Sequence, residues 1–319
     1  MKGVIVTDHN SIENALVIGA GVMGHGIAQV FAQAGIHVGL VDLDESLLER
    51  AMKLAKSNLE VLAEFGRVPG DRIQEILARI HPSTDLDSAA RDKHFVLEAV
   101  SEVPEIKKQV FSRLDELCPP DCIIASNTSS LDIFSIASIK RPARLIVAHW
   151  FAPPHIIPLV EVVPGPETDR EAVEFTANLM ERLGKKTIIM EKFIPSFIVN
   201  RIQRSISIAV WEMVEMGWAT PEQIDMAVKN TLGIRLPIVG VVQSMDFTGL
   251  DLIADIMKGR GGVNPLVAEK VRLGHLGAKT SKGIYDYGER SEEEILKKRD
   301  RLYLQILGHL ETLKAFDPV

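Results

Sequence analysis

The chain places a glycine-rich turn between a short apolar run and a segment with helical spacing, and this arrangement constrains the fold more than any other. The turn follows the apolar residues 15–18 and has the pattern Gly-x-Gly-x-x-Gly. In such a turn the first glycine allows a tight bend, the second lets backbone amides approach a pyrophosphate, and the third lets helix and strand pack closely. Unpaired amides at the start of the helix favour an anion. The residues predicted to hold a dinucleotide are Gly19, Gly21, Val22, Met23 and Gly24.

A second apolar run, residues 36–41, ends on Asp42, eighteen positions after Gly24. That spacing suits a carboxylate that accepts hydrogen bonds from the adenosine ribose. Its charge would repel the 2′-phosphate of NADP by roughly 4 kcal/mol at about 4 Å and an effective dielectric constant of about 20. A glycine-rich turn can also occur without a ligand, but here strand, turn, helix, second strand and acidic residue follow in register. We therefore predict NAD as the cofactor.

Composition excludes several classes of protein. The 319 residues suffice for two domains, and the net charge of -7 argues against nucleic acid as a partner. The two cysteines, Cys118 and Cys122, provide neither a disulfide framework nor a cysteine-rich metal site, so no metal is predicted. The first eight residues turn polar too early for a signal peptide. No apolar run approaches the roughly 18–20 residues of a membrane helix. We expect a cytoplasmic protein without a membrane partner.

Hydrophobic periodicity predicts an α/β domain followed by helices. Residues 15 to about 190 alternate strand and helix, the pattern of a Rossmann-like doubly wound parallel sheet. Two helical patterns, residues 47–62 and 73–80, predict a helical hairpin inserted after the second strand, with Pro82 ending the second helix. From Pro195 onward the pattern is helical. We predict a dinucleotide-binding domain over 1–191 and an all-α substrate and dimerisation domain over 192–319.

Polar residues that follow the predicted strands are the candidates for chemistry, because doubly wound sheets bind ligands at the carboxyl ends of their strands. They form three groups, residues 98–107, 126–130 and 149–155, and Asn200 follows early in a long helix. Each also has a plain structural interpretation. A histidine after a strand often caps or faces solvent, a hydroxyl-rich turn caps a helix, and Glu161 could simply face water.

Seven segments together resemble the L-3-hydroxyacyl-CoA dehydrogenase family over nearly the whole chain. They are GAGVMGHGIA from residue 19, LEAVSE from 97, SNTSS from 126, HWFAPP from 149, PLVEVV from 158, IVNR from 198 and SKGIYDY from 281. The family is NAD-dependent and has a dinucleotide-binding domain followed by a mostly helical domain that forms dimers. The resemblance therefore implies an oxidoreductase of fatty acid metabolism that acts as a homodimer.

Carried over to the matching positions, the resemblance gives four residues catalytic roles. His149 becomes the general base that removes the hydroxyl proton as hydride passes to the nicotinamide, and an unperturbed histidine pKa of about 6.5 suits that task. Glu161 matches the carboxylate that fixes the imidazole. Ser129 and Asn200 match the residues that donate hydrogen bonds to the substrate oxygen.

Positions near the cofactor in the family are matched by further polar residues. We assign Glu102, Lys107 and Asn127 to cofactor binding on this basis.

The chain departs from the acyl-CoA enzymes at Ala152, where they usually carry an asparagine. Residues 153–168 and 233–235 are closer to relatives that oxidise free hydroxy acids, the L-gulonate 3-dehydrogenase (lambda-crystallin) and L-carnitine dehydrogenase group. A free acid needs a cation for its carboxylate, and Arg235 could form a bidentate pair with it or an ordinary inter-domain ion pair. We hypothesise that Arg235 or His155 sets the choice of substrate.

A coenzyme A thioester would instead use basic residues near its phosphates. Four basic residues of the predicted hairpin fit that role or a solvated helix face equally well: Lys53, Lys56, Arg67 and Arg72.

Three functions remain open. The first is reversible NAD-dependent oxidation of an L-3-hydroxyacyl substrate, foremost a coenzyme A thioester, to the 3-keto product. The second is oxidation of a free 3-hydroxy acid such as L-gulonate or L-carnitine. The third is a binding, structural or sensor protein that keeps the dinucleotide fold without turnover, as lens crystallins do. The joint presence of His149, Glu161, Ser129 and Asn200 argues against the third.

Overall fold

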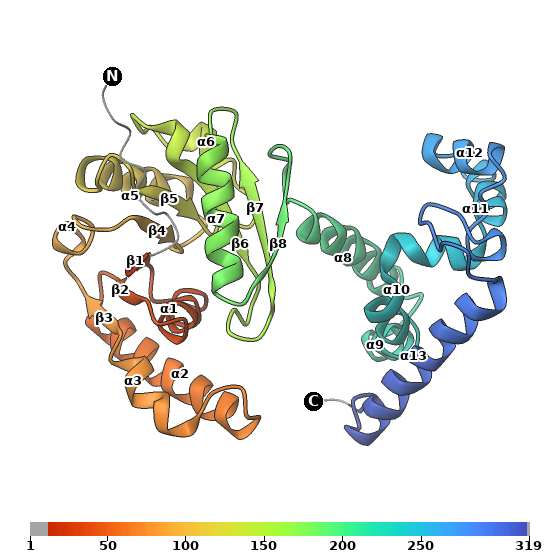
Figure 1. Ribbon diagram of the computed structural model, residues 1–319, viewed down its shortest axis with the longest axis horizontal. Helices are drawn as coiled ribbons and strands as arrows, with labels where there is room; N and C mark the ends of the chain where they lie inside the picture. Colours follow the sequence, from red (N-terminus) through yellow and green to blue (C-terminus); the bar gives the residue numbers. More distant parts are fainter. Residues whose placement is uncertain (1–11, 318–319) are drawn as a thin grey trace. The chain divides into compact units, whose positions relative to one another are not determined.

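The computed structural model describes residues 12–317 of the chain (Figure 1). The expectation about a signal peptide concerns residues 1–8, which lie outside the described residues. The chain divides into two compact units, Met1–Ser205 and Ile206–Val319, and helix α8 (Val199–Glu215) runs across the division. The domain boundary at residue 191 stays a prediction.

An eight-stranded sheet forms the centre of the first unit, in the order β3-β2-β1-β4-β5-β6-β7-β8. All neighbouring strands are parallel except β6 and β7, which are antiparallel. This order confirms the predicted Rossmann-like sheet. The strands are β1 (Asn14–Ile18), β2 (His37–Val41), β3 (Ile80–Ser83), β4 (Phe95–Glu98), β5 (Ile123–Ser126), β6 (Leu145–Trp150), β7 (Leu159–Pro164) and β8 (Lys186–Ile189).

Both faces of the sheet are covered, which explains why its central strands read as continuous apolar runs. Along β1, Ala15 and Val17 join one hydrophobic cluster while Leu16 and Ile18 join another. Alternate residues of a strand point to opposite faces. Figure 1 shows α1 and α7 against the sheet, and their side chains belong to the first cluster, whereas those of α5 belong to the second. The helices of this unit before α8 are α1 (Gly24–Gln33), α2 (Glu45–Glu64), α3 (Ile73–Leu77), α4 (Leu86–Ala89), α5 (Pro104–Leu117), α6 (Ile133–Ile136) and α7 (Arg170–Arg182).

The predicted hairpin follows β2 as α2 and α3, but its second helix is shorter than expected. Helix α3 ends at Leu77, and Ile80–Ser83 forms β3, paired with β2. The prediction of helix to residue 80 was therefore wrong. The apolar residues at 73, 76, 77 and 80 have helical spacing, and this spacing led to the prediction although Ile80 belongs to a strand. Pro82 fits the strand because β3 lies at the edge of the sheet, where a missing amide hydrogen is tolerated.

The second unit is helical, as predicted. Thr220 and Gln223 form a capping box at the start of α9, with Pro221 in its first turn. The buried Asp246 accepts hydrogen bonds from the amides of Ile284 and Tyr285 and ties the 281–287 segment to α10. Its helices after α8 are α9 (Pro221–Lys229), α10 (Leu232–Thr248), α11 (Leu250–Lys258), α12 (Pro265–Arg272) and α13 (Glu292–Thr312).

Within residues 12–317, no single helix has the length and apolar composition to cross a membrane. Helices α10 and α11 meet that criterion only when counted together, and they are bent by 81° at their junction.

Candidate active site

The glycine-rich turn has the geometry that a dinucleotide requires. Gly19 has a φ of +99°, and a Cβ there would lie 2.5 Å from the carbonyl oxygen of Ala99. A Cβ on Gly24 would lie 1.6 Å from the carbonyl oxygen of Gly19, so neither position accepts another residue. Gly21, in contrast, has nothing within 4 Å of its absent Cβ, and no side chain caps the start of α1. The turn therefore leaves open space beside free helix amides, which fits a pyrophosphate.

The two residues between Gly21 and Gly24 differ in exposure. Val22 is 77% exposed, whereas Met23 is half-buried and packs against the core. Val22 therefore presents more of its side chain to solvent than Met23 does.

Asp42 follows β2 and contacts the same turn. Its Oδ2 accepts a hydrogen bond of 2.7 Å from the amide of Ala20, and its Oδ1 accepts one of 2.7 Å from the amide of Leu43. Each carboxylate oxygen can accept a second hydrogen bond. The carboxylate is therefore fixed beside the turn with acceptor capacity left for ribose hydroxyls.

His149 and Glu161 face each other across the antiparallel pair β6 and β7. They are direct partners in the strand register, and Nδ1 of His149 lies 2.8 Å from Oε2 of Glu161. Both side chains are buried, 3% and 0% exposed. Because a carboxylate only accepts, the hydrogen bond requires the proton on Nδ1, and in the neutral imidazole Nε2 then carries the lone pair.

The second oxygen of Glu161 binds the start of α8. Its Oε1 accepts hydrogen bonds from the amides of Ile198 and Val199 at 3.1 and 3.0 Å. The Phe151 and Phe197 rings pack on the imidazole of His149, with centroids 4.5 and 5.3 Å away. Sequence reasoning did not single out these contacts, although Phe151 lies in HWFAPP and Ile198 and Val199 lie in IVNR.

Asn200, in the first turn of α8, joins Ser129 to His149. Its Nδ2 donates to the carbonyl oxygen of Ser129 at 3.2 Å and lies 3.4 Å from Nε2 of His149. The Ser129 residue is exposed, and its hydroxyl has no hydrogen-bond partner among residues 12–317. The structure thus brings together the four residues predicted to be catalytic, with Nε2, an amide and a free hydroxyl available to a ligand.

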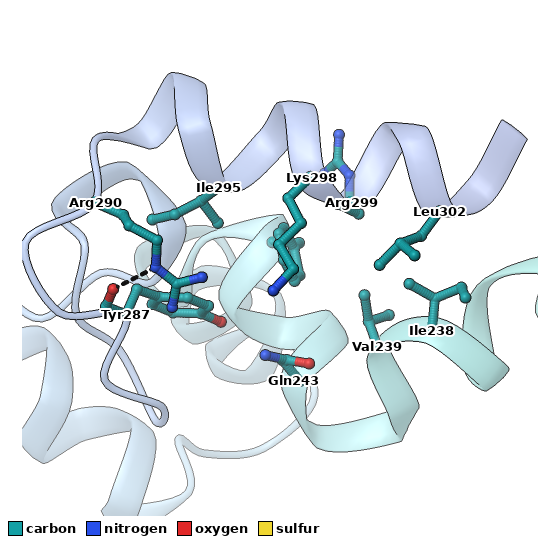
Figure 2. A pocket seen from close by; sticks show the side chains of 10 residues that line it. Ile238, Val239, Gln243, Tyr287, Arg290, Ile295, Lys298, Arg299 and Leu302 are labelled. Carbon is teal, nitrogen blue, oxygen red and sulfur yellow. Dashed lines mark hydrogen bonds between the residues drawn. The ribbon is translucent and has the colours of Figure 1, made fainter. Parts of the chain in front are cut away.

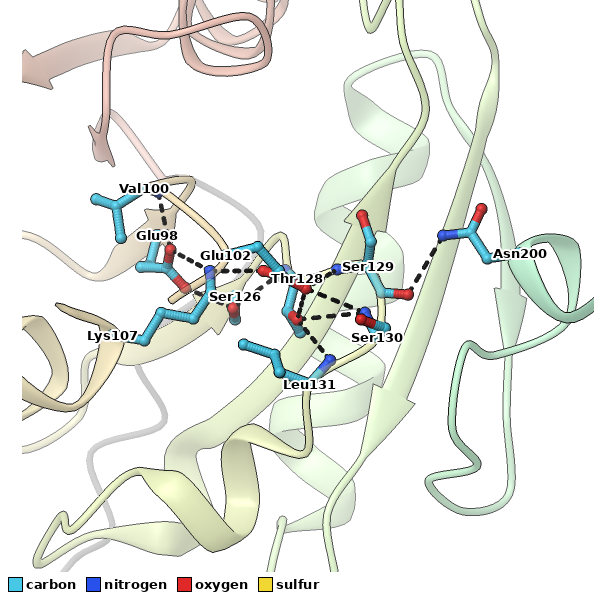
Figure 3. Close-up of polar contacts among 10 residues, drawn as sticks. All are labelled: Glu98, Val100, Glu102, Lys107, Ser126, Thr128, Ser129, Ser130, Leu131 and Asn200. Atoms are coloured by element: carbon cyan, nitrogen blue, oxygen red, sulfur yellow. Dashed lines mark hydrogen bonds and ion pairs between the residues drawn. The ribbon is translucent and has the colours of Figure 1, made fainter. Parts of the chain in front are cut away.

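Glu102 forms several hydrogen bonds with the turn that carries Ser129 (Figure 3). Its Oε1 accepts hydrogen bonds from the Thr128 hydroxyl at 2.6 Å and from the amides of Ser129 and Ser130 at 2.9 and 3.1 Å. Burial alone would raise the pKa of Glu102. The Thr128 hydroxyl, the charge of Lys107 and the Ser129 amide together lower that pKa below its usual value. Glu102 is therefore an anion at neutral pH.

Asn127, also predicted to bind the cofactor, contacts the strand that carries the histidine. Its Oδ1 accepts a hydrogen bond of 2.8 Å from the amide of Trp150. The side chain thereby joins the end of β5 to the end of β6, one residue after His149.

His155 lies against α1 rather than beside His149. A Cβ on Gly26 would lie 3.4 Å from its Nδ1, and that nitrogen is buried without a partner in the described part of the chain. Burial lowers the pKa of His155, and the nearby His25 and Lys185 lower it further. No hydrogen bond joins it to His149 within residues 12–317.

Arg235 is exposed in the first turn of α10, in the second unit. The same helix lines a pocket of about 310 Å³ shown in Figure 2, but Arg235 is not one of the lining residues. The cations there, Arg290, Lys298 and Arg299, were not predicted, because nothing in their spacing sets them apart from solvated surface cations.

The basic residues of the hairpin do not all fit one interpretation; some lie on a solvated helix face, and one could contact a bound coenzyme A. Lys56 pairs with Glu60 at 3.5 Å and Arg72 with Glu75 at 3.1 Å, as on an ordinary solvated helix face. Lys53 instead lines a cavity of about 550 Å³ beside the start of α2.

We predict that Asp42→Asn shifts cofactor preference toward NADP. The amide keeps an acceptor for Ala20 but removes the charge that repels a 2′-phosphate. The ratio of NADPH to NADH affinity should rise by about 10- to 100-fold, the value of one charged hydrogen bond. Fluorescence titration with both reduced cofactors measures the ratio. Asp44→Asn, at the exposed cap of α2, should leave it unchanged, and an unchanged ratio in Asp42→Asn would assign the preference to another group.

Comparison with known proteins agrees with this geometry. Residues 14–193 match the family described as 3-hydroxyacyl-CoA dehydrogenase, NAD binding domain, and residues 197–287 match 3-hydroxyacyl-CoA dehydrogenase, C-terminal domain. A probable 3-hydroxybutyryl-CoA dehydrogenase of Bacillus subtilis is 36% identical over 289 residues, covering 88% of this chain and 99% of the relative. The 5-formyl-3-hydroxy-2-methylpyridine 4-carboxylate 5-dehydrogenase of Mesorhizobium japonicum is 29% identical, covering 94% and 99%.

A solved structure shares the fold. The 3-hydroxyacyl-CoA dehydrogenase from Archaeoglobus fulgidus superposes with a TM-score of 0.74 at 31% identity, covering 93% of this chain and 99% of its own. The chain belongs to the 3-hydroxyacyl-CoA dehydrogenase family and is an NAD-dependent oxidoreductase.

Proposed function

We propose that the protein reversibly oxidises the hydroxyl group of an L-3-hydroxyacyl coenzyme A thioester to the 3-keto product, with His149 as general base. The observation that carries the proposal is the buried hydrogen bond of 2.8 Å between His149 and Glu161. The thioester is favoured by the similarity to the 3-hydroxybutyryl-CoA dehydrogenase of Bacillus subtilis.

The described contacts support a role for each residue. Glu161 accepts the Nδ1 proton of His149, so Nε2 is the atom that takes the proton of the substrate hydroxyl. The resulting imidazolium is stabilised by the facing carboxylate. Bound NAD supplies the hydride acceptor. The Asn200 amide and the Ser129 hydroxyl donate to the substrate oxygen, which gains negative charge when the keto product is reduced. In that direction the imidazolium returns its proton.

We predict that His149→Gln lowers kcat by about 10²- to 10⁴-fold, the range expected for loss of a general base. Glutamine keeps a polar group near Glu161 but cannot take a proton. The affinity for NADH should stay close to that of the unmodified protein, because the glycine-rich turn and Asp42 are untouched. Steady-state kinetics and a fluorescence titration measure the two quantities. Full turnover in the variant would refute the assignment of the base.

A free 3-hydroxy acid is the second candidate substrate. Ala152 stands where the acyl-CoA enzymes usually carry an asparagine, and two hairpin cations are already paired with glutamates. The relative from Mesorhizobium japonicum is named for a carboxylate substrate. These observations favour a site that accepts an acid without the coenzyme A arm.

A substrate panel separates the candidates. It holds 3-hydroxybutyryl-CoA, L-gulonate, L-carnitine and 3-hydroxybutyrate, with NADH formation followed by absorbance and NADP as the cofactor control. We expect activity on the thioester. Activity on the free acids alone would favour the second candidate substrate. No activity on any member would favour a binding protein without turnover.

The same panel tests Arg235 and His155 as specificity residues. If a free acid is turned over and Arg235 binds its carboxylate, Arg235→Met should raise the KM for that acid by about 10-fold or more, the value of a charged hydrogen bond. Arg272→Met, at the end of α12, is the matched control. An unchanged KM would show that Arg235 does not bind the substrate carboxylate, and His155 would remain as the candidate specificity residue.

We also propose that the protein is a cytoplasmic homodimer acting in fatty acid metabolism. Exposed apolar side chains on α8 and α10 support a subunit contact; they include Ile206, Ile208, Trp211, Val241 and Val242. Val239, in contrast, is buried. Sedimentation equilibrium should therefore give twice the chain mass of 35.2 kDa, and a mass of one chain would contradict the dimer.

A further inference from the structure

Glu98 is a fully buried carboxylate to which neither the sequence nor the proposed reaction assigns a role. It is the last residue of β4 and is 0% exposed. Its Oε1 accepts hydrogen bonds from the Val100 amide at 2.8 Å and from Nζ of Lys107 at 2.7 Å, and its Oε2 accepts one from the Ser126 hydroxyl at 2.6 Å (Figure 3). A buried charge is costly unless it is paired and hydrogen-bonded. The fold meets both conditions, so this carboxylate has a fixed position.

Lys107 transmits that position to Glu102. Its side chain is 1% exposed, and its Nζ lies 2.7 Å from Oε1 of Glu98 and 3.2 Å from Oε2 of Glu102. The shorter contact, with the fully buried partner, determines where the ammonium lies. The ammonium in turn limits where the half-exposed Glu102 carboxylate can lie.

Glu102 connects this pair to the candidate active site. Its other oxygen, Oε1, accepts from the amides of Ser129 and Ser130, and the Ser129 carbonyl accepts from Asn200. Figure 3 shows these contacts running from Glu98 through Lys107 and Glu102 to Asn200. Asn200 also lies 3.4 Å from Nε2 of His149. A continuous series of polar contacts therefore joins the buried carboxylate to the proposed base.

We infer that Glu98 is a positioning residue, which acts through Lys107 and Glu102 to hold the turn at residues 128–130 against Asn200. Its effect on turnover rests on the proposed function, whereas its effect on the turn does not. Glu98 itself contacts only groups of its own unit, and none of them is His149 or Asn200 among residues 12–317.

Glu98→Gln tests the inference because it keeps the size of the side chain and one acceptor oxygen, and removes its charge. Lys107 then has only Glu102 as a charged partner and draws that carboxylate away from the amides of Ser129 and Ser130. Hydrogen exchange of these two amides should become about 10-fold faster. The kcat should fall by about 10- to 100-fold, as for a misplacement of about 1 Å. The substrate KM should stay within about threefold.

Asp115→Asn is the matched control. Asp115 is another buried carboxylate, close to the end of α5, and pairs with Arg141 at 3.3 Å. Its neutralisation should lower the thermal stability without changing kcat or the exchange of the 128–130 turn. Glu102→Gln keeps the size of a half-exposed side chain and an oxygen for the Thr128 hydroxyl, and removes the charge that pairs with Lys107. It should also accelerate exchange at this turn, and it decides the question if Glu98→Gln does not fold.

Each outcome is decisive. Unchanged exchange and unchanged kcat in folded Glu98→Gln would overturn the inference, as would unchanged exchange in Glu102→Gln when the first variant does not fold. An equal loss of kcat in Asp115→Asn would attribute the effect to general stability and would overturn it too. If the unmodified protein turns over no member of the panel, the proposed function fails, and the exchange measurement still decides the role of Glu98.

Discussion

The antiparallel pairing of β6 with β7 is the constraint on which the candidate active site depends. It is the one reversal of direction among the sheet's neighbouring strands within residues 12–317. Residues directly opposite in such a pair have Cβ atoms about 4.5–5.5 Å apart. A slip of one residue would turn Glu161 to the other face of the sheet. The contact between His149 and Glu161 is thus set by backbone hydrogen bonds, and the side chains need little freedom of their own.

Two carboxylates, Glu161 and Glu102, organise the backbone on either side of this pair. Glu161 binds two amides at the start of α8 with the oxygen that does not face His149. Glu102 binds two amides of the turn after β5. Asn200 joins the two groups through the Ser129 carbonyl. Hydrogen bonds in such connected networks strengthen one another, so loss of either anion is expected to disturb both segments.

The sequence predicts those parts of the molecule that depend on local spacing. The roles of Gly19 and Gly24 and the buried strands follow from residues close together in the chain. The edge strand β3 was missed because its residues continue a helical pattern, and only its pairing with β2 decides the matter.

Contacts between distant segments have no comparable signal. Asn127, expected at the cofactor, has its oxygen on the Trp150 amide, and His155 lies on α1. The hydrogen bond from the Ile198 amide to Glu161 joins residues 37 positions apart in sequence. Residue type and spacing cannot distinguish such partners from solvent, because the distance between them is set by how the sheet and helices pack.

The contact of Asn200 with His149 explains how the site can be both ordered and available. The lone pair of Nε2 that would take the substrate proton is faced by Nδ2 of Asn200 at 3.4 Å, which is long for a hydrogen bond between nitrogen atoms. A substrate hydroxyl that replaces this weak contact would cost the protein little interaction energy. The Asn200 amide keeps its shorter contact with the Ser129 carbonyl and can direct its second hydrogen at the substrate oxygen. In the proposed reaction the same amide would therefore both stay bound to the Ser129 turn and donate to the substrate oxygen.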